Sequence, residues 1–286
     1  MESMRHETVL GIVLVTCLAS AAIAETRKEF RYTVSTKDKA IISVDTQYGA
    51  ITVRPGPAMH VSVIAIAQDK AQVDHLQKGN RIEIETQLLK DADKQTGRVD
   101  YELMVPPNAS VSLRSSTGPL TVEHLRGDIT LEGAEAPIEV HNSGGGGNHV
   151  HVKTMSGPVT LNEVRNAHIE ITSISGDVHL TSVTGELVQV NSGSGKIFYD
   201  GDFGMGGDYD FSTHTGDIEA LVPAGASADF NAHSMQGQVQ SDVSLVQNEH
   251  PRFPVEAGRS FFGTVGKAAS EVVFKSISGK IRLKRR

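Results

Sequence analysis

The chain has 286 residues, with 27 lysines and arginines against 34 aspartates and glutamates, and a net charge of −7. A mildly acidic chain without a sustained basic stripe is a poor candidate for binding nucleic acid. The only cysteine is Cys17, so residues 18–286 can form neither a disulfide with one another nor a reactive thiolate.

Residues 1–24 have the features of a signal peptide. Arg5 precedes the apolar run of residues 9–19, and a small-x-small triplet follows at residues 22–24. The apolar run is too short to cross a bilayer, and no longer one follows, so we expect no transmembrane segment. Cys17 resembles the cysteine of a lipoprotein processing site, but Thr16 is a poor residue before it, and the sequence favours a protein without a lipid anchor. We therefore expect export to the periplasm or the cell surface.

Residues 25–108 contain alternating apolar and polar runs and predict a strand-rich N-terminal capping segment. Within it, Asp69–Gln77 is compatible with one short helix. A terminal coil of a repeat stack would otherwise expose its core and its unpaired edge, and a cap prevents this.

From residue 109 to residue 286 a five-residue frame recurs: a small residue, any residue, an apolar residue, any residue, and usually a second apolar residue. Gly176-Asp177-Val178-His179-Leu180 is a typical copy. Apolar and polar residues that alternate over five positions predict a short, half-buried strand. The frames start at residues 109, 118, 127, 136, 148, 157, 167, 176, 185, 195, 207, 216, 228, 237, 270 and 279.

The spacing of these frames predicts an all-β fold, a parallel two-sheet β-solenoid. Every second step is nine residues, once ten, whereas the steps between vary from 9 to 33 residues, so one corner is tight and the other accepts insertions. Alternate frames would stack in sequence order into two facing sheets around a thin apolar core. An antiparallel meander or sandwich is the alternative. The largest insertion, near residues 244–268, would close the far end or cover one corner.

The tight corner has its own sequence signature. Glycine begins many frames there, as a positive φ or a close backbone approach requires. Three residues earlier a hydroxyl side chain recurs, which we expect to bond backbone groups of the turn. These side chains are Ser115, Thr154, Ser173, Ser192, Thr213, Ser234 and Ser276.

An ordered set of motifs runs through almost the whole chain after the leader. It opens with Gly49-Ala-Ile51-Thr-Val53, repeats Ser173-Ile-Ser-Gly176-Asp-Val178 in the middle, and closes with Ser276-Ile-Ser-Gly279-Lys-Ile281. In these features the chain resembles a family of bacterial exported proteins of unknown function with β-strand repeats, known as putative adhesins. The resemblance implies a surface or periplasmic β-solenoid and carries over no catalytic residue.

Four residues form a candidate metal site: His149, His151, His168 and Glu170. They occupy outward positions of the frames that start at 148 and 167, and Glu186 would follow His168 in the next frame. Several imidazoles and a carboxylate can ligate zinc or another divalent metal. An exposed polar ladder without a ligand explains the same pattern, and the sequence leaves both readings open.

No pattern indicates catalysis. The outward positions lack a repeated acid pair, and the chain has no tryptophan to form a sugar platform. The acidic stretch Asp200–Asp210 lacks the spacing of a calcium loop and is better explained as a corner. We expect a non-enzymatic exported scaffold without a cofactor, whose partner is an envelope or surface component, protein or glycan. The alternatives are a periplasmic glycan-binding or glycan-cleaving β-helix protein and a metal-binding envelope protein.

Overall fold

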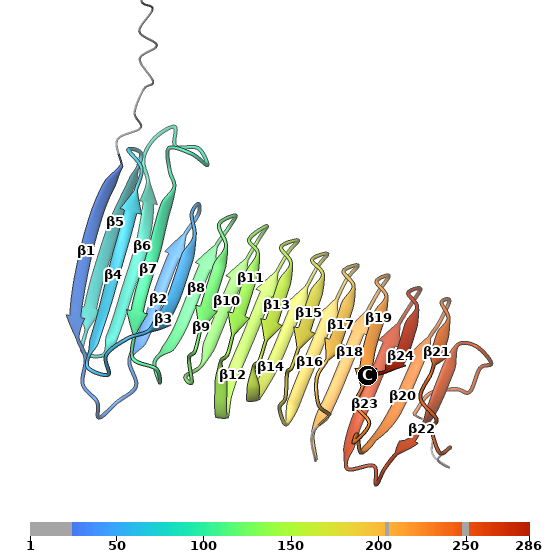
Figure 1. The fold of residues 1–286 in the computed structure, drawn as a ribbon. Coiled ribbons are helices and arrows are strands. Elements are labelled where there is room, and N and C mark those ends of the chain that lie inside the picture. The colour runs from blue at the N-terminus through green and yellow to red at the C-terminus, as the bar shows by residue number, and fades with distance from the viewer. Residues whose placement is uncertain (1–24, 204–205, 248–251) are drawn as a thin grey trace, which may run out of the picture.

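The computed structural model describes residues 25–203, 206–247 and 252–286, which form one elongated, twisted stack of strands (Figure 1). The stack consists of two 12-stranded sheets. The described residues form no helix long and apolar enough to cross a membrane. The expected leader at residues 1–24 lies outside the described residues.

Each sheet contributes one strand to each coil of the stack. Sheet A contains, in spatial order, β1 (Thr26–Thr33), β4 (His60–Ala67), β7 (Val99–Val105), β3 (Ile51–Pro55), β9 (Leu120–Glu123), β11 (Ile138–His141), β13 (Val159–Asn162), β15 (Val178–Thr181), β17 (Ile197–Asp200), β19 (Ile218–Val222), β24 (Ile281–Arg285) and β21 (Val239–Ser241). Sheet B contains, from the same end, β5 (Ala71–Lys78), β6 (Arg81–Leu88), β2 (Ile41–Thr46), β8 (Ser110–Ser115), β10 (Ile129–Gly133), β12 (Gly144–Thr154), β14 (Arg165–Ser173), β16 (Leu187–Ser192), β18 (Asp208–Thr213), β23 (Ser270–Ser276), β20 (Ala228–Ser234) and β22 (Ser260–Val265).

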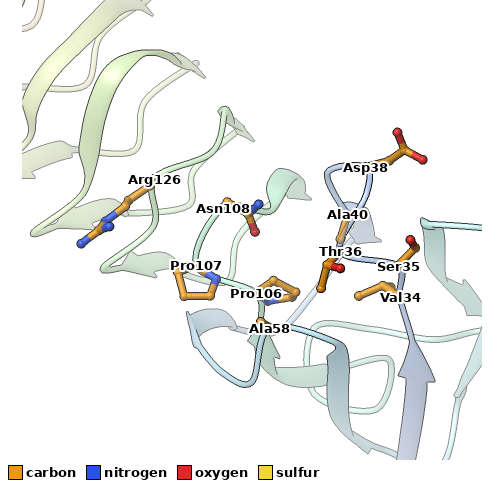
Figure 2. A pocket seen from close by; sticks show the side chains of 10 residues that line it. All are labelled: Val34, Ser35, Thr36, Asp38, Ala40, Ala58, Pro106, Pro107, Asn108 and Arg126. Carbon is orange, nitrogen blue, oxygen red and sulfur yellow. The ribbon is translucent and has the colours of Figure 1, made fainter.

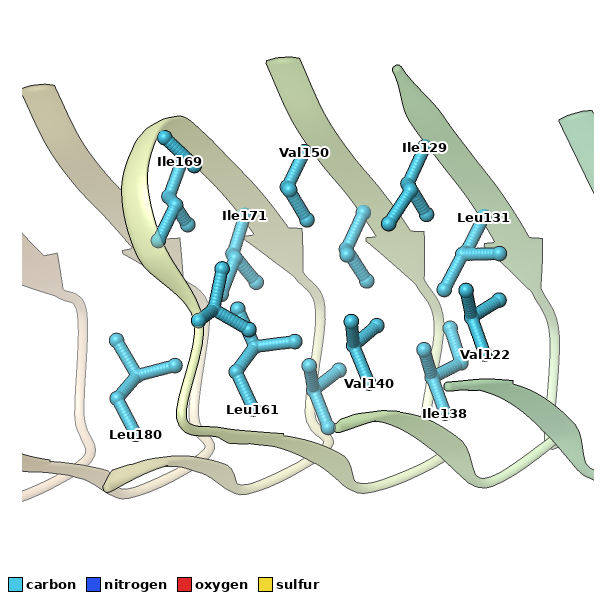
Figure 3. Close-up of a cluster of buried hydrophobic side chains, with 14 of the residues drawn as sticks. Val122, Ile129, Leu131, Ile138, Val140, Val150, Leu161, Ile169, Ile171 and Leu180 are labelled. Atoms are coloured by element: carbon cyan, nitrogen blue, oxygen red, sulfur yellow. The ribbon is translucent and has the colours of Figure 1, made fainter. Parts of the chain in front are cut away.

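Neighbouring strands of the repeat run parallel and in register, which confirms the predicted two-sheet solenoid. Val150 on β12 lies opposite Ile169 on β14, and Val140 on β11 lies opposite Leu161 on β13. Figure 3 shows such side chains from the two sheets pointing at one another across a thin interior. Their complete burial removes apolar surface from water and is the main stabilising contribution to the fold.

The tight corner depends on glycine because backbones approach closely there, and among the glycines that begin the strands of this corner only Gly49 also has a positive φ, of 114°. Gly195 is outside the left-handed region, yet an added Cβ would lie 2.0 Å from the carbonyl oxygen of Gly176 in the preceding coil. The predicted hydroxyl ladder is confirmed: the buried Ser192 Oγ donates a hydrogen bond to Gly195 O at 3.0 Å, and the Gly216 N–H donates to Thr213 Oγ1 at 3.0 Å.

The opposite corner uses left-handed residues that the sequence pattern did not reveal. A single residue with φ between 48° and 55° follows each sheet A strand from β9 to β15. Backbone hydrogen bonds join these residues to the next coil, as from His124 N to His141 O at 3.0 Å. The residues are His124, Asn142, Glu163 and Ser182.

At the N-terminal end the solenoid begins earlier than residue 109. Strands β2 and β3 stack directly on β8 and β9, and β6 and β7 form the next coil outward. The antiparallel strands β1, β4 and β5 then cover the end. The helix expected at Asp69–Gln77 is wrong, since β5 pairs with β6 over its whole length. This pairing satisfies the backbone better than a short isolated helix can, because helices of this length are marginal on their own.

At the C-terminal end the coils do not follow the order of the sequence, which corrects our expectation. Strands β23 and β24 insert between the coil of β18 and β19 and the coil of β20 and β21. Phe274 on β23 stacks on Phe211 of β18, with ring centroids 5.3 Å apart. Within the described part of the insertion near 244–268, β22 pairs antiparallel with β20 and covers the end of sheet B. The long connection between β21 and β23 allows the chain to form the outer coil of β20 and β21 first and then to return and form the coil of β23 and β24 beneath it.

Candidate functional site

The predicted histidine neighbourhood exists on the outer surface of sheet B. The register places His149 opposite His168 and His151 opposite Glu170. The rings of His149 and His168 meet edge to face with centroids 5.1 Å apart, and His151 Nδ1 lies 3.3 Å from Glu170 Oε2. We call the surface formed by these four residues the histidine face.

Asp128 borders the histidine face on β10's side and is held as a carboxylate. Its Oδ1 accepts a hydrogen bond from the His149 backbone N–H at 3.1 Å, and this bond is the first cause that lowers the pKa of Asp128. Lys39 Nζ also lies 3.8 Å from Asp128 Oδ2. Asp128 therefore places a negative charge at the edge of the histidine face, and the His149 N–H and Lys39 already offset part of that charge.

The expected register at the next coil is wrong by one residue. His168 lies opposite Leu187, where Glu186 was expected, and Glu170 lies opposite Gln189. The shift puts Val188 and Val190 inside, both fully buried, and a slip of one residue moves every side chain of a strand to the other face. Glu186 still reaches the site from the strand's start, with Oε2 3.6 Å from His168 Nε2.

The arrangement does not hold a preformed metal site. Among the described residues no three histidine, aspartate or glutamate side chains converge as metal ligands. The imidazoles of His151 and His168 face Glu170 and Glu186. A metal would require these side chains to rotate away from their partners, so metal binding at the histidine face stays a prediction.

Zinc titration tests that prediction. If the face ligates zinc, the double variant His149→Ala/His168→Ala should bind at least about tenfold more weakly than the wild type, because two imidazole ligands are lost. His179→Ala, which removes an exposed outward histidine from β15 of sheet A, is the matched control. Identical calorimetric titration curves for wild type and double variant would remove the metal site.

A hollow of about 310 Å³ lies at the N-terminal end, where four segments of the chain meet. Figure 2 shows Arg126 and Asp38 on opposite sides of it, with Pro106 and Pro107 between them. Val34 and the two prolines provide apolar surface, so the hollow can accept a small apolar group. No sequence motif indicates this hollow, because its lining comes from segments that are far apart in the chain.

An exposed apolar pair marks the tight corner of sheet B. Met155 and Ile174 are 56% and 58% exposed on neighbouring coils, beside a groove of about 370 Å³. The groove exists because Gly133 and Ala134 replace larger residues at the adjacent turn. Met155 and Ile174 each follow a residue of the hydroxyl ladder, Thr154 and Ser173, so their shared position could be predicted from the repeat.

A family model described as Toastrack DUF4097 matches residues 40–284. Among solved structures, a putative adhesin from Bacteroides fragilis NCTC 9343 is 11% identical, with 91% of this chain and 97% of that chain covered and a TM-score of 0.48. A putative cell adhesion protein from Clostridium sporogenes ATCC 15579 is 12% identical over 91% and 100% of the two chains, with a TM-score of 0.27. A putative adhesin from Parabacteroides merdae ATCC 43184 is 12% identical over 90% and 96%, with a TM-score of 0.32. These scores are too low to carry an argument, and no curated protein matches the chain.

Proposed function

The chain belongs to the Toastrack DUF4097 family, and from this premise we propose that it is an exported, non-enzymatic scaffold that binds an envelope or surface component through the outer face of sheet B. The observation that carries the proposal is the parallel register of β10, β12, β14 and β16. This register aligns polar side chains into rows on a rigid surface. Such rows suit recognition of a partner more than the assembly of a reaction centre.

The titration behaviour of the carboxyl groups supports binding over catalysis. A general acid needs a raised pKa at neutral pH. Among the described residues, Asp93, Glu123 and Asp128 are the carboxyl groups with a resolved shift, and in all three the pKa is lowered. For Glu123 the first cause is a hydrogen bond from the Arg54 side chain. These groups form stable surface charges.

The strongly perturbed groups are tyrosines inside the solenoid. Burial raises the pKa of Tyr101 to about 12, and burial also raises the pKa of Tyr199 and Tyr209. Tyr199 and Tyr209 donate hydrogen bonds to backbone carbonyls, such as that from Tyr209 Oη to Gly185 O at 2.8 Å. The buried rings of Tyr199 and Tyr209 fill the core, where they pack against Phe203.

Site-directed crosslinking tests the proposed binding face. Residues 25–286 contain no cysteine, so a single introduced cysteine carries a photo-crosslinker without interference. We expect Thr172→Cys, on the outer face of sheet B, to capture a defined envelope component from intact cells. The matched variant Thr160→Cys, on the outer face of sheet A, should capture much less.

Equal yields from the two variants would contradict a specific role for sheet B. A labelled protein that stays in the cytoplasmic fraction would contradict export. Capture of glycan alone would identify the bound component as a glycan, and capture of a protein would identify it as a protein partner.

A further inference from the structure

A polar hollow lies beside the histidine face, where β12, β14 and β16 begin. Its volume is about 610 Å³, within the ~300–1,000 Å³ range of small-molecule sites. Its walls include the backbone of Gly146 and Gly147 and the side chains of Asn166, His168, Thr184 and Glu186.

One wall exists because the repeat is interrupted. Gly144 pairs with Arg165 and Asn148 pairs with Ala167, so the three glycines between them bulge out opposite Asn166 alone. Gly145, Gly146 and Gly147 have φ angles of 127°, 75° and 80°, and an added Cβ on any of them would meet nothing within 4 Å. The close approach of backbones that requires glycine at the tight corner is therefore absent at these three glycines. Bulges re-aim a strand and are frequent beside binding sites.

The hydrogen-bonding groups in the hollow are largely free. The Asn166 N–H donates to Thr184 Oγ1 at 3.3 Å, whereas the Asn166 side-chain amide has no hydrogen bond within the described residues. The Glu186 side chain is 85% exposed, and its one ionic contact within the described ranges is with His168 at 3.6 Å. An amide, a carboxylate, an imidazole and peptide groups therefore converge on one space.

The chemistry of the lining selects among ligands. The carboxylate of Glu186 disfavours an anion, and the absence of three converging ligands among the described residues disfavours a tightly held metal. The side chains that line the hollow include no aliphatic wall for an acyl chain. Vicinal hydroxyls pair well with a carboxylate, an amide and peptide carbonyls, because each hydroxyl both donates and accepts.

We propose that this hollow binds a sugar ring of a neutral glycan, with Glu186 and Asn166 as the principal hydrogen-bonding side chains. The inference rests on the proposed binding role of sheet B and names the chemistry of its ligand. Affinity for a single ring should be low, in the millimolar range, because the hollow is open and polar groups must be desolvated.

Saturation-transfer NMR on residues 25–286 tests the proposal, with glucose, galactose, mannose and N-acetylglucosamine as the probes. At least one sugar should receive saturation, and Glu186→Gln should weaken its binding about tenfold, as loss of a hydrogen bond to a charged group implies. Asn166→Asp should also weaken binding. Glu139→Gln, a matched change on sheet A, should leave binding unchanged, and equal melting temperatures would show that all variants fold.

Two results would overturn the proposal: no saturation of any of the four sugars at tens of millimolar, or equal binding by Glu186→Gln and the wild type. The test is separable from that of the binding face. If Thr172→Cys captures a protein partner while no sugar binds, the scaffold function stands and the sugar site is wrong.

Discussion

Replacing Gly195 with alanine should lower the free energy of unfolding by about 3 kcal/mol or more. The added Cβ would lie 2.0 Å from Gly176 O and 2.6 Å from its carbonyl carbon. Both atoms belong to backbone that is fixed by the ladder of the preceding coil, so relief requires the coils to separate. The change would also disturb the hydrogen bond from Ser192 Oγ to Gly195 O. Urea unfolding followed by circular dichroism measures the loss.

Gly225→Ala is the matched control for this prediction. An added Cβ at Gly225 meets nothing within 4 Å, and its φ lies outside the left-handed region. We expect that variant to unfold at the same urea concentration as the wild type or at a slightly higher one, because alanine reduces the entropy of the unfolded chain. Equal unfolding midpoints for Gly195→Ala and Gly225→Ala would show that the corner is not closely packed.

Ending the chain at Lys267 should unfold the coil of β20 and β21, although those strands precede the deletion. β23 and β24 are the parallel partners of β20 and β21, and β21 has no other neighbour in sheet A. The corner between them also depends on the inserted coil, since Met235 N and Gln236 N donate to Ser276 O and Ile277 O. Hydrogen exchange should show protection of residues 228–241 falling from that of core strands to near that of an unfolded chain.

A chain that ends at Arg285 is the control for the truncation, because it loses mainly the Arg286 contact with Asp200. Its exchange pattern should match that of the full chain. If residues 228–241 stayed protected in the chain that ends at Lys267, the coils would stack in sequence order, and the inserted position of β23 and β24 would be wrong.

Much of the central solenoid could be predicted from local pattern because one rule applies to every coil. The apolar pair in frames such as Gly176–Leu180 identifies a strand and its inner face. The nine-residue step identifies the tight corner. The apolar pair and the nine-residue step together predict that His149 pairs with His168, as it does. The prediction from the frame at Gly185 was wrong because its third position is Leu187, whereas the alternating apolar pair that is buried, Val188 and Val190, begins one residue later.

The candidate sites were less predictable than the strands. The hollow beside the histidine face draws its walls from three coils and from a glycine insertion that, as sequence, is an ordinary corner loop. The hollow at Pro106 and Arg126 combines loops separated by tens of residues. Neither has a motif, because the side chains that line each are brought together only by the stacking.

Periodicity in the chain by itself determined that short strands would lie side by side around a thin apolar layer, since burial of two alternating side chains per strand allows little else. Only the tertiary structure decided which coils are neighbours at the two ends, where β6 and β7 lie outside β2 and β3, and β23 and β24 lie inside β20 and β21. The physical reason is that every coil presents nearly the same backbone edge and apolar face. Long connections then leave several stacking orders open, and the choice falls to side-chain contacts such as that between Phe211 and Phe274.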